Sequence, residues 1–408
     1  MKALVKSKPI VGQEWPKGLK IEERPEPQIK DSGEVKLKVL AAALCGTDIS
    51  IYNSTDALKE SMKNINENGV ITGHEFCSEL VEAGEAAKKK IFDLILVFYA
   101  DNQLVKDFIN SRSKEEVVAD PTWLDFVKNN FYLTAEMHLV CWQCRQCQNN
   151  ESHACKNTII KGLHQDGAFA PYVVVPSSNL IIFLKNELPV EIIAFMDAIG
   201  NATHTVQSAG VEGKNILILG AGIQGLMAVA VARKMGAAKI FINDASDPAR
   251  GLTPEVLQST KFAMAKKLGA DYCFDVSLQK AEFEQKVKEV TNETGVDAVL
   301  EMSGSYYALA DGFKNVRMAG VIALLGLPSG KMEVDFSKDI IFRGITVKGV
   351  IGRQMFKTWE VMRTILTSGL AELLIKSGIV THDLPLEKFE EGFAALKKGE
   401  ALKVLLRP

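Results

Sequence analysis

Four cysteines gather in the middle of the chain with the spacing C-x2-C-x2-C-x7-C, at Cys141, Cys144, Cys147 and Cys155. Thiolates at this density are typical of a closed tetrahedral zinc site that stabilises a loop-rich segment. A C-x2-C-x2-C run also ligates iron–sulfur clusters, where proline commonly follows the last cysteine. No proline follows Cys155 here, so the pattern favours structural zinc.

A second set of metal-binding residue types lies nearer the N-terminus, in CGTD at 45–48 and GHE at 73–75. The thiolate of Cys45, the imidazole of His74 and nearby carboxylates are the ligand types of a catalytic zinc that keeps one position open. Taken singly, Cys45 is equally well a buried structural thiol and His74 a core histidine, the commoner fate of each. Only the combination indicates a catalytic metal.

A glycine-rich turn follows an apolar run in the second half of the chain. Residues 216–219 are apolar and mostly branched, as in a strand buried on both faces, and GAGIQG follows at 220–225. In G-x-G-x-x-G the first glycine makes the bend, the second admits a pyrophosphate, and the third lets the next helix pack closely. The first N–H groups of that helix bind phosphate. The candidate cofactor-binding residues are Gly220, Gly222, Ile223, Gln224 and Gly225.

The position of Asp244 favours a dinucleotide site over an ordinary strand-to-helix turn. It ends a second expected strand, residues 238–243, about 20 residues beyond the glycines, where an acid meets the ribose 2′-hydroxyl. The carboxylate would repel a 2′-phosphate, so the sequence predicts NAD in preference to NADP.

The elements around the glycine turn alternate between helix and strand. Expected strands cover residues 272–276, 297–302, 321–326 and 345–350. This alternation predicts an α/β fold with a doubly wound parallel sheet and right-handed crossovers. Residues 1–43 and 168–182 instead show short apolar runs between proline and glycine, which predict β-rich structure.

Residues 88–130 interrupt the β-rich part. The run KKKIFDLILVFY at 88–99 joins a basic cluster to an apolar stretch typical of a strand, and residues 104–126 carry apolar residues at helical spacing. A long structureless loop is uncommon in a compact domain, so we expect a strand and helix here.

Composition limits the classes of function. At 408 residues the chain exceeds one ordinary hydrophobic core, so two domains are expected. A net charge of −2 without a basic tract argues against nucleic acid, and no apolar run or signal-like N-terminus argues for a membrane. Seven cysteines, four of them clustered, indicate metal binding in a reducing cytoplasm.

Over nearly its whole length the sequence resembles the zinc-dependent medium-chain dehydrogenases, in particular the L-threonine 3-dehydrogenase group. Besides the four cysteines, the matching segments are CGTD at 45–48, GHEF at 73–76, DGAFA at 166–170, GNATHT at 200–205, LEMSG at 300–304, ALLGLP at 323–328 and GRQMFKTW at 352–359. GNATHT and GRQMFKTW separate this group from general alcohol and polyol dehydrogenases. Residues 88–130 and a shorter insertion at 247–258 lie outside the resemblance.

The resemblance implies a GroES-like catalytic domain over 1–195, with the insertion 88–130 and the cysteine lobe 141–155. A Rossmann domain over 196–350 and a C-terminal segment, 351–408, returning to the catalytic domain would follow. It further implies NAD-dependent oxidation of L-threonine to 2-amino-3-ketobutyrate, by a homo-oligomer that in this group is usually a tetramer.

The resemblance also implies roles for single residues. Cys45, His74 and Asp197 would ligate the catalytic zinc, with Glu75 beside them as an exchangeable ligand or supporting carboxylate, so two zinc ions per chain are expected. Thr47 would begin a proton relay between the substrate hydroxyl and the nicotinamide ribose, and His138 would lie at the site rim.

The sequence departs from the family pattern at several positions. The histidine that usually ends the relay, five residues after the ligand cysteine, is Ser50, and the glycine after GHE-x-x is Ser78. Pro171 replaces the acid of FAEY, and the G-D-R-V strand entry is absent. Two alternative functions stay open: a dehydrogenase of another small polyol or amino alcohol, and a catalytically silent binder of zinc and nucleotide.

Overall fold

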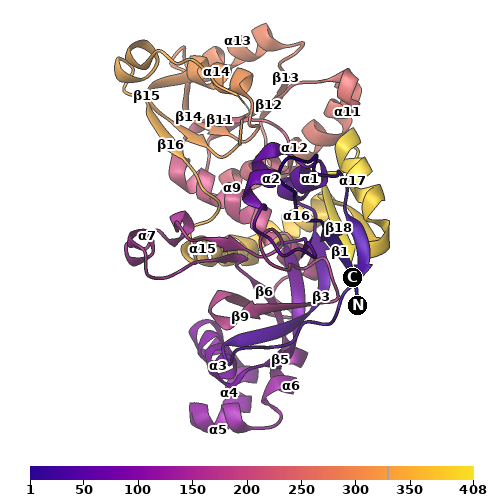
Figure 1. Ribbon diagram of the computed structural model, residues 1–408. Coiled ribbons are helices and arrows are strands. Elements are labelled where there is room, and N and C mark those ends of the chain that lie inside the picture. The colour runs from indigo at the N-terminus through magenta and orange to yellow at the C-terminus, as the bar shows by residue number, and fades with distance from the viewer. Residues whose placement is uncertain (329) are drawn as a thin grey trace.

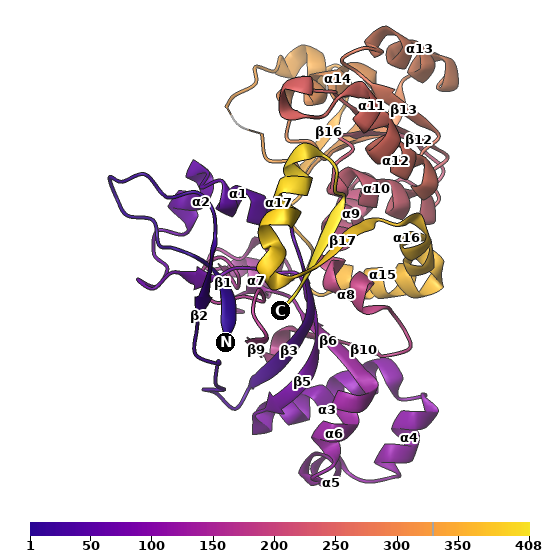
Figure 2. The same cartoon turned by 90° about the vertical axis from the view of Figure 1, so that its right-hand side faces the viewer.

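A computed structural model describes residues 1–328 and 330–408 of the chain. Two large β-sheets lie one above the other in Figure 1, with helices packed between and around them. The N- and C-terminal ends lie close together beside the lower sheet in both views (Figures 1 and 2). Among the described residues, no helix is long and apolar enough to cross a membrane.

The upper sheet is parallel and has the strand order β13-β12-β11-β14-β15-β16. The bounds are β11 Asn215–Leu219, β12 Lys239–Asp244, β13 Tyr272–Asp275, β14 Val296–Glu301, β15 Val316–Leu324 and β16 Thr346–Gly349. Along β11, Ile216 and Ile218 enter one core, and Leu217 and Leu219 enter another on the opposite face. The strand order reverses its direction next to β11, the first strand of this sheet in the chain. This reversal confirms the predicted doubly wound fold.

Helices cover both faces of this sheet. They are α9 Met196–Ala209, α10 Ile223–Lys234, α11 Pro254–Leu257, α12 Ala263–Leu268, α13 Lys280–Val290 and α14 Tyr306–Asn315. Residues of α9, α10 and α12 share the core of Ile216, while Phe283 of α13 and Phe313 of α14 share that of Leu217. The alternation of apolar side chains along each strand therefore holds the three layers together.

The lower sheet has the order β10-β6-β5-β3-β18-β17, with β9 also paired to β3. The bounds are β3 Glu34–Ala43, β5 Phe76–Ala83, β6 Phe131–Ala135, β9 Tyr172–Pro176, β10 Leu180–Leu184, β17 Val380–Pro385 and β18 Lys403–Arg407. Strand β18 runs antiparallel to β3, with Leu405 opposite Ala43, so the end of the chain completes the sheet that its beginning started.

Smaller elements complete the lower half. A three-stranded sheet has β1 Lys2–Lys6 between β2 Lys20–Glu23 and β4 Val70–Ile71, and β7 His138–Leu139 pairs with β8 Ile159–Ile160. The remaining helices outside the insertion are α1 Gly46–Tyr52, α2 Asp56–Ser61, α7 Arg145–Gln148, α8 Val190–Ala194, α15 Lys357–Ile365, α16 Ala371–Ser377 and α17 Phe389–Lys398.

The insertion is entirely helical, so the strand predicted within residues 88–99 is wrong. Four helices occupy the segment: α3 Glu85–Tyr99, α4 Gln103–Ile109, α5 Lys114–Ala119 and α6 Trp123–Asn130. They form the lower end of the molecule in Figures 1 and 2. In α3, Ala87, Ile91, Ile95 and Tyr99 are buried at a spacing of four, whereas Val97 is exposed. This helical period outweighs the strand preference of the branched residues.

A polar clamp ties the insertion to the C-terminal segment. Arg363 of α15 pairs with Glu187 at 2.9 Å and donates a 2.6 Å hydrogen bond to the hydroxyl of Tyr99 in α3. The guanidinium lies 4.0 Å from the ring centre of Phe183 and 4.4 Å from that of Phe98. Both partners of the ion pair are largely shielded from water, with side-chain exposures of 13% and 18%.

We expect Arg363→Met to lower the free energy of unfolding by about 3 kcal/mol, because the change leaves the Glu187 carboxylate without its partner in a shielded place. Lys376→Met, which removes an exposed ion pair with Glu372, should cost less than about 1 kcal/mol. Urea unfolding followed by circular dichroism measures both. Equal midpoints for the two variants would contradict the clamp.

Candidate active site

Four predicted metal ligands meet where the lower sheet faces the upper half. Candidate ligand atoms of Cys45, His74, Glu75 and Asp197 all lie within 4.8 Å of one another, and all four residues are buried. Cys45 follows β3 and precedes α1, His74 and Glu75 precede β5, and Asp197 lies in the first turn of α9. One thiolate, one imidazole and two carboxylates form a donor set suited to zinc.

A buried carboxylate oxygen of this cluster, Glu75 Oε1, has no partner among the described residues and supports a bound cation. Among the described residues, His74 Nδ1, Glu75 Oε1 and Asp48 Oδ1 are buried without a hydrogen-bond partner. Each such atom costs about 1–3 kcal/mol when left unpaired. His74 Nδ1 lies 3.8 Å from Asp48 Oδ1, and the other Asp48 oxygen accepts a 2.9 Å bond from the Cys45 N–H. Asp48 is thus placed to orient the imidazole, as carboxylates behind metal-binding histidines do.

Glu75 is held from the C-terminal strand. Lys403 of β18 forms an ion pair with Glu75 Oε2 and donates a 2.9 Å hydrogen bond to the carbonyl of Leu44. Burial alone would lower the pKa of Lys403, but the charges of Glu75 and Cys45 raise it above its ordinary value. The ammonium therefore stays charged and keeps one Glu75 oxygen from the other ligand atoms.

Arg353 joins the ligand cluster to a second carboxylate. Its guanidinium pairs with Asp197 on one side and with Glu136 on the other, at 2.7 and 3.0 Å to the Glu136 oxygens. The indole N–H of Trp359 donates a further 2.9 Å bond to Glu136. Burial alone would raise the pKa of Glu136, but Arg353 and then His138 lower it well below its usual range. The carboxylate remains ionised.

Sequence reasoning missed Glu136, Arg353, Asp48 and Lys403 as members of the site. GRQMFKTW contains Arg353 and Trp359, and the motif served only to identify the group. The sequence held one signal for these residues: an arginine and two aromatic side chains lie close together in a segment that this enzyme group shares. Nothing in the sequence indicates that Lys403 contacts Glu75, because the two residues are 328 positions apart in the chain.

Thr47, Ser50 and His138 are the three residues that the sequence placed at the reacting end of the site. Thr47 Oγ1 lies 4.0 Å from Cys45 Sγ and is half-buried, as the start of a relay requires. Ser50, one turn further along α1, donates a 3.2 Å bond to the carbonyl of Gly46. His138 is partly exposed, and its Nδ1 lies 2.7 Å from Glu136 Oε1, which leaves Nε2 for other partners.

A cleft leads from the cluster to the predicted nucleotide site. Its volume is about 300 Å³, and its walls include Cys45, Gly46, Gly222, Ile223 and Asp244. Cys45 lies in the lower half and Asp244 ends β12 in the upper half, so a ligand in this cleft would touch both. An extended dinucleotide requires such a path between a reacting carbon and its adenosine end.

The glycine turn has the geometry that a pyrophosphate site needs. Gly220 has a φ of +96°, and a Cβ on it would lie 2.8 Å from Ser303 Cβ. A Cβ on Gly225 would lie 1.9 Å from the carbonyl oxygen of Gly220, whereas one on Gly222 would meet nothing within 4 Å. Gly222 caps the N-terminus of α10, so its open side faces the cleft. Only the second glycine leaves room for a ligand.

Asp244 has partners on both oxygens. Oδ1 accepts a 2.8 Å bond from the Ala245 N–H, and Oδ2 accepts from the Ala221 N–H at 3.1 Å. Lys261 lies 3.0 Å from the same Oδ2. The sequence does not indicate this contact, because Lys261 lies 17 positions after Asp244 in the chain. Gln224, on the first turn of α10, has a buried amide oxygen without a partner among the described residues.

The four predicted thiols form a separate cluster. Cys141, Cys144, Cys147 and Cys155 offer sulfur atoms within 4.8 Å of one another, with separations of 3.5 Å for Cys144–Cys147 and Cys141–Cys155. A tetrahedron with zinc–sulfur bonds of about 2.3 Å has sulfurs about 3.8 Å apart. The cluster therefore fits a zinc ion, and none of the four thiols is in a disulfide.

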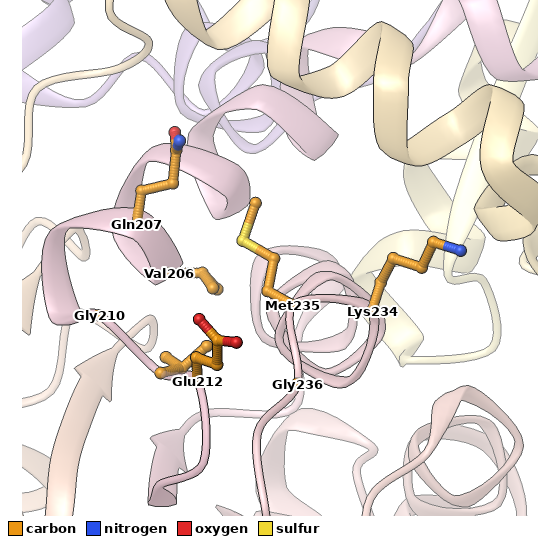
Figure 3. A pocket seen from close by; sticks show the side chains of 8 residues that line it. Val206, Gln207, Gly210, Glu212, Lys234, Met235 and Gly236 are labelled. Atoms are coloured by element: carbon orange, nitrogen blue, oxygen red, sulfur yellow. The ribbon is translucent and has the colours of Figure 1, made fainter.

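A larger hollow of about 680 Å³ opens at the opposite, amino-terminal edge of the parallel sheet, beyond the ends of α9 and α10. Figure 3 shows Glu212 and Met235 directed into it, with Gln207 and Lys234 at its margin. Ligands of doubly wound sheets bind at the carboxyl ends of the strands. We therefore assign no role in the reaction to this hollow.

Comparison with known proteins agrees with this geometry. Residues 31–97 match the family model described as "Alcohol dehydrogenase GroES-like domain", and residues 224–368 match "Zinc-binding dehydrogenase". A zinc-binding dehydrogenase structure from Sinorhizobium meliloti 1021, bound to NADP, has a TM-score of 0.71 and 23% identity over 100% of both chains. At that identity the likeness supports the fold.

Curated relatives named L-threonine 3-dehydrogenase are similar over the full length. The L-threonine 3-dehydrogenase of Caldanaerobacter subterraneus subsp. tengcongensis is 34% identical over 400 residues, which are 98% of each chain. That of Pyrococcus abyssi is 33% identical over 406 residues, 99% of this chain and 98% of its own. These matches confirm the resemblance predicted from the motifs, and the chain belongs to the zinc-dependent medium-chain dehydrogenases, in the L-threonine 3-dehydrogenase group.

Proposed function

We propose that this chain oxidises the 3-hydroxyl of L-threonine with NAD, giving 2-amino-3-ketobutyrate. The observation that carries the proposal is one continuous path, which runs from the buried cluster of metal-ligand types at Cys45 through a cleft to the glycine turn and to Asp244 at the end of β12. The full-length similarity to L-threonine 3-dehydrogenases supplies the choice of alcohol.

Cys45, His74 and Asp197 would hold the catalytic zinc, and Glu75 would serve as an exchangeable or supporting carboxylate. Zinc in such a site acts as a Lewis acid that lowers the pKa of a hydroxyl, and NAD accepts hydride. The surrounding side chains hold the ligands in position. Asp48 orients the His74 ring, Lys403 restrains Glu75, and Arg353 fixes Asp197.

Thr47 would take part in removing the hydroxyl proton. Its hydroxyl is next to the cluster and donates to no backbone carbonyl among the described residues, so it can accept from the substrate and donate towards the nicotinamide ribose. The relay must then pass the proton to water, because Ser50 cannot hold it near neutral pH. His138 would lie at the substrate rim, with Nδ1 fixed by Glu136.

We further propose that the protein is a homo-oligomer, in this group a tetramer, working in the cytoplasm. Strand β16 is an exposed sheet edge, and Ile341 and Phe342 beside it are 66% and 78% exposed. Unpaired edges with apolar neighbours invite pairing with a second copy. The seven unpaired thiols fit a reducing compartment. The domain limits 1–195, 196–350 and 351–408 are part of the same proposal.

A substrate panel tests the function. Purified enzyme is given NAD with L-threonine, sorbitol, 2,3-butanediol or 1-amino-2-propanol, and NADH absorbance is followed. We expect the highest kcat/KM with L-threonine. Faster oxidation of a polyol would move the assignment to the alternative dehydrogenases, and no NADH with any alcohol would favour a silent binder.

We expect two zinc ions per chain, in two sites of unequal lability. Cys147→Ser should reduce the zinc content to one, because it removes a thiolate from the closed lobe. Cys273→Ser, on β13 away from both clusters, should leave two. Elemental analysis of protein purified without chelators measures this, and fewer than two zinc ions in the unaltered protein contradict the prediction.

NAD should be preferred to NADP, and Asp244→Ser should lower that preference at least about tenfold, since the carboxylate repels a 2′-phosphate. Glu289→Ser, which removes an exposed carboxylate from α13, serves as the control. The ratio of kcat/KM for the two cofactors is the measurement. An unchanged ratio in Asp244→Ser rules out this role.

Ser50→His should raise kcat near pH 7 and flatten the pH profile. An imidazole has a pKa near neutrality and can pass the proton from the relay to water, which a serine hydroxyl cannot. The gain should be at the low end of the usual range, about 10²-fold or less, because the end of α1 is partly exposed to water. Steady-state rates from pH 6 to 10 test it. Identical profiles would show that turnover does not depend on the missing group.

A further inference from the structure

The insertion between β12 and α12 forms an ordered loop, residues 245–260, at the adenosine end of the cleft. Asp247 and Leu252 pair through two backbone hydrogen bonds, of 2.7 and 3.1 Å. Thr253 then caps α11 by accepting a 3.3 Å bond from the Val256 N–H, and Leu257 is fully buried. The 245–260 loop is therefore held in one shape by its own bonds.

An ion pair closes the base of this loop. Asp244 precedes it and Lys261 follows it, and the two side chains are 3.0 Å apart. Asp244 is also the residue proposed to accept from the adenosine ribose. Cofactor contact and loop position therefore depend on the same carboxylate.

The tip of the loop crosses to the other half of the molecule. Leu252 packs against Gly399, which ends α17: a Cβ on Gly399 would lie 3.3 Å from Leu252 Cδ1. The preceding residue in the loop, Gly251, also approaches Lys398 of α17: a Cβ on Gly251 would lie 3.8 Å from the Lys398 carbonyl oxygen. With a φ of +74°, Gly399 is at a position where a side chain would be both strained and crowded.

These contacts lie across the proposed cofactor path. Asp244, Leu252 and Lys261 line one side of the cleft, and Leu396, Lys397 and Gly399 line the other. Resting on the proposed function, we propose that the contact between Leu252 and Gly399 closes the cleft over the adenosine end of the bound dinucleotide. Leu252 is a positioning residue for the cofactor, and NADH leaves only after this contact opens.

The rate of NADH release tests the proposal. Enzyme loaded with NADH is mixed with excess NAD in a stopped-flow instrument, and the loss of bound-NADH fluorescence is followed. Leu252→Ala should speed release about tenfold and weaken NADH binding equally, because the truncated side chain no longer spans the cleft.

Two companion variants separate this role from general loosening. Val256→Ala truncates a partly buried residue of the same loop that does not line the cleft, and it should release NADH at the original rate. Leu252→Met keeps the reach of the side chain and should restore slow release. Normal release from Leu252→Ala, or equal acceleration in Val256→Ala, overturns the inference while leaving the proposed function standing. Failure of the unaltered protein to bind NADH overturns both.

Discussion

The ligand cluster depends on one buried positive charge. Arg353 is 3% exposed, and a charge so shielded is tolerated only when opposite charges surround it. Asp197 and Glu136 provide them, from α9 and from the turn after β6. Because Arg353 lies 217 positions after Glu136 in the chain, this single group fixes three distant segments at once. A carboxylate paired in this way is also ionised and oriented before any metal arrives.

Much of the fold follows from local patterns. Alternating apolar residues on β11 and the glycine turn after it specify a parallel sheet, because few other arrangements bury both faces of a strand and then make so tight a bend. Right-handed crossovers then limit the orders in which the six strands can lie. The secondary structure of residues 88–99 was harder to predict. The branched residues in IFDLILVFY favour a strand locally, but the segment is a helix, in which Ala87, Ile91, Ile95 and Tyr99 are buried at a spacing of four.

The residues of the candidate site also fall into two groups, those that the sequence identifies and those that only the structure reveals. Residues with distinctive chemistry and close spacing, such as the four cysteines, were found from the sequence, and the structure gathers them. Residues that act by reaching across the fold were not. Arg353 and Lys403 are ordinary surface residue types until tertiary contacts bury them at 3% and 1% exposure. Residues 88–130 and 247–258, which lie outside the motifs of the resemblance, also attach to the C-terminal segment, the first through Arg363 and the second through Gly399.

The position of β18 in the lower sheet has a consequence for the order in which the molecule is built. Cys45 and His74 leave the ribosome early, but Lys403, which neutralises Glu75 beside them, follows 328 positions after its partner. Contacts between such distant residues form late because a long loop must close first. During synthesis the nascent chain therefore carries the Glu75 carboxylate without its counter-charge, close in sequence to a thiol and an imidazole. In that interval the half-made site is open to any soft metal ion in the cell, and correct metallation becomes a matter of timing as well as affinity.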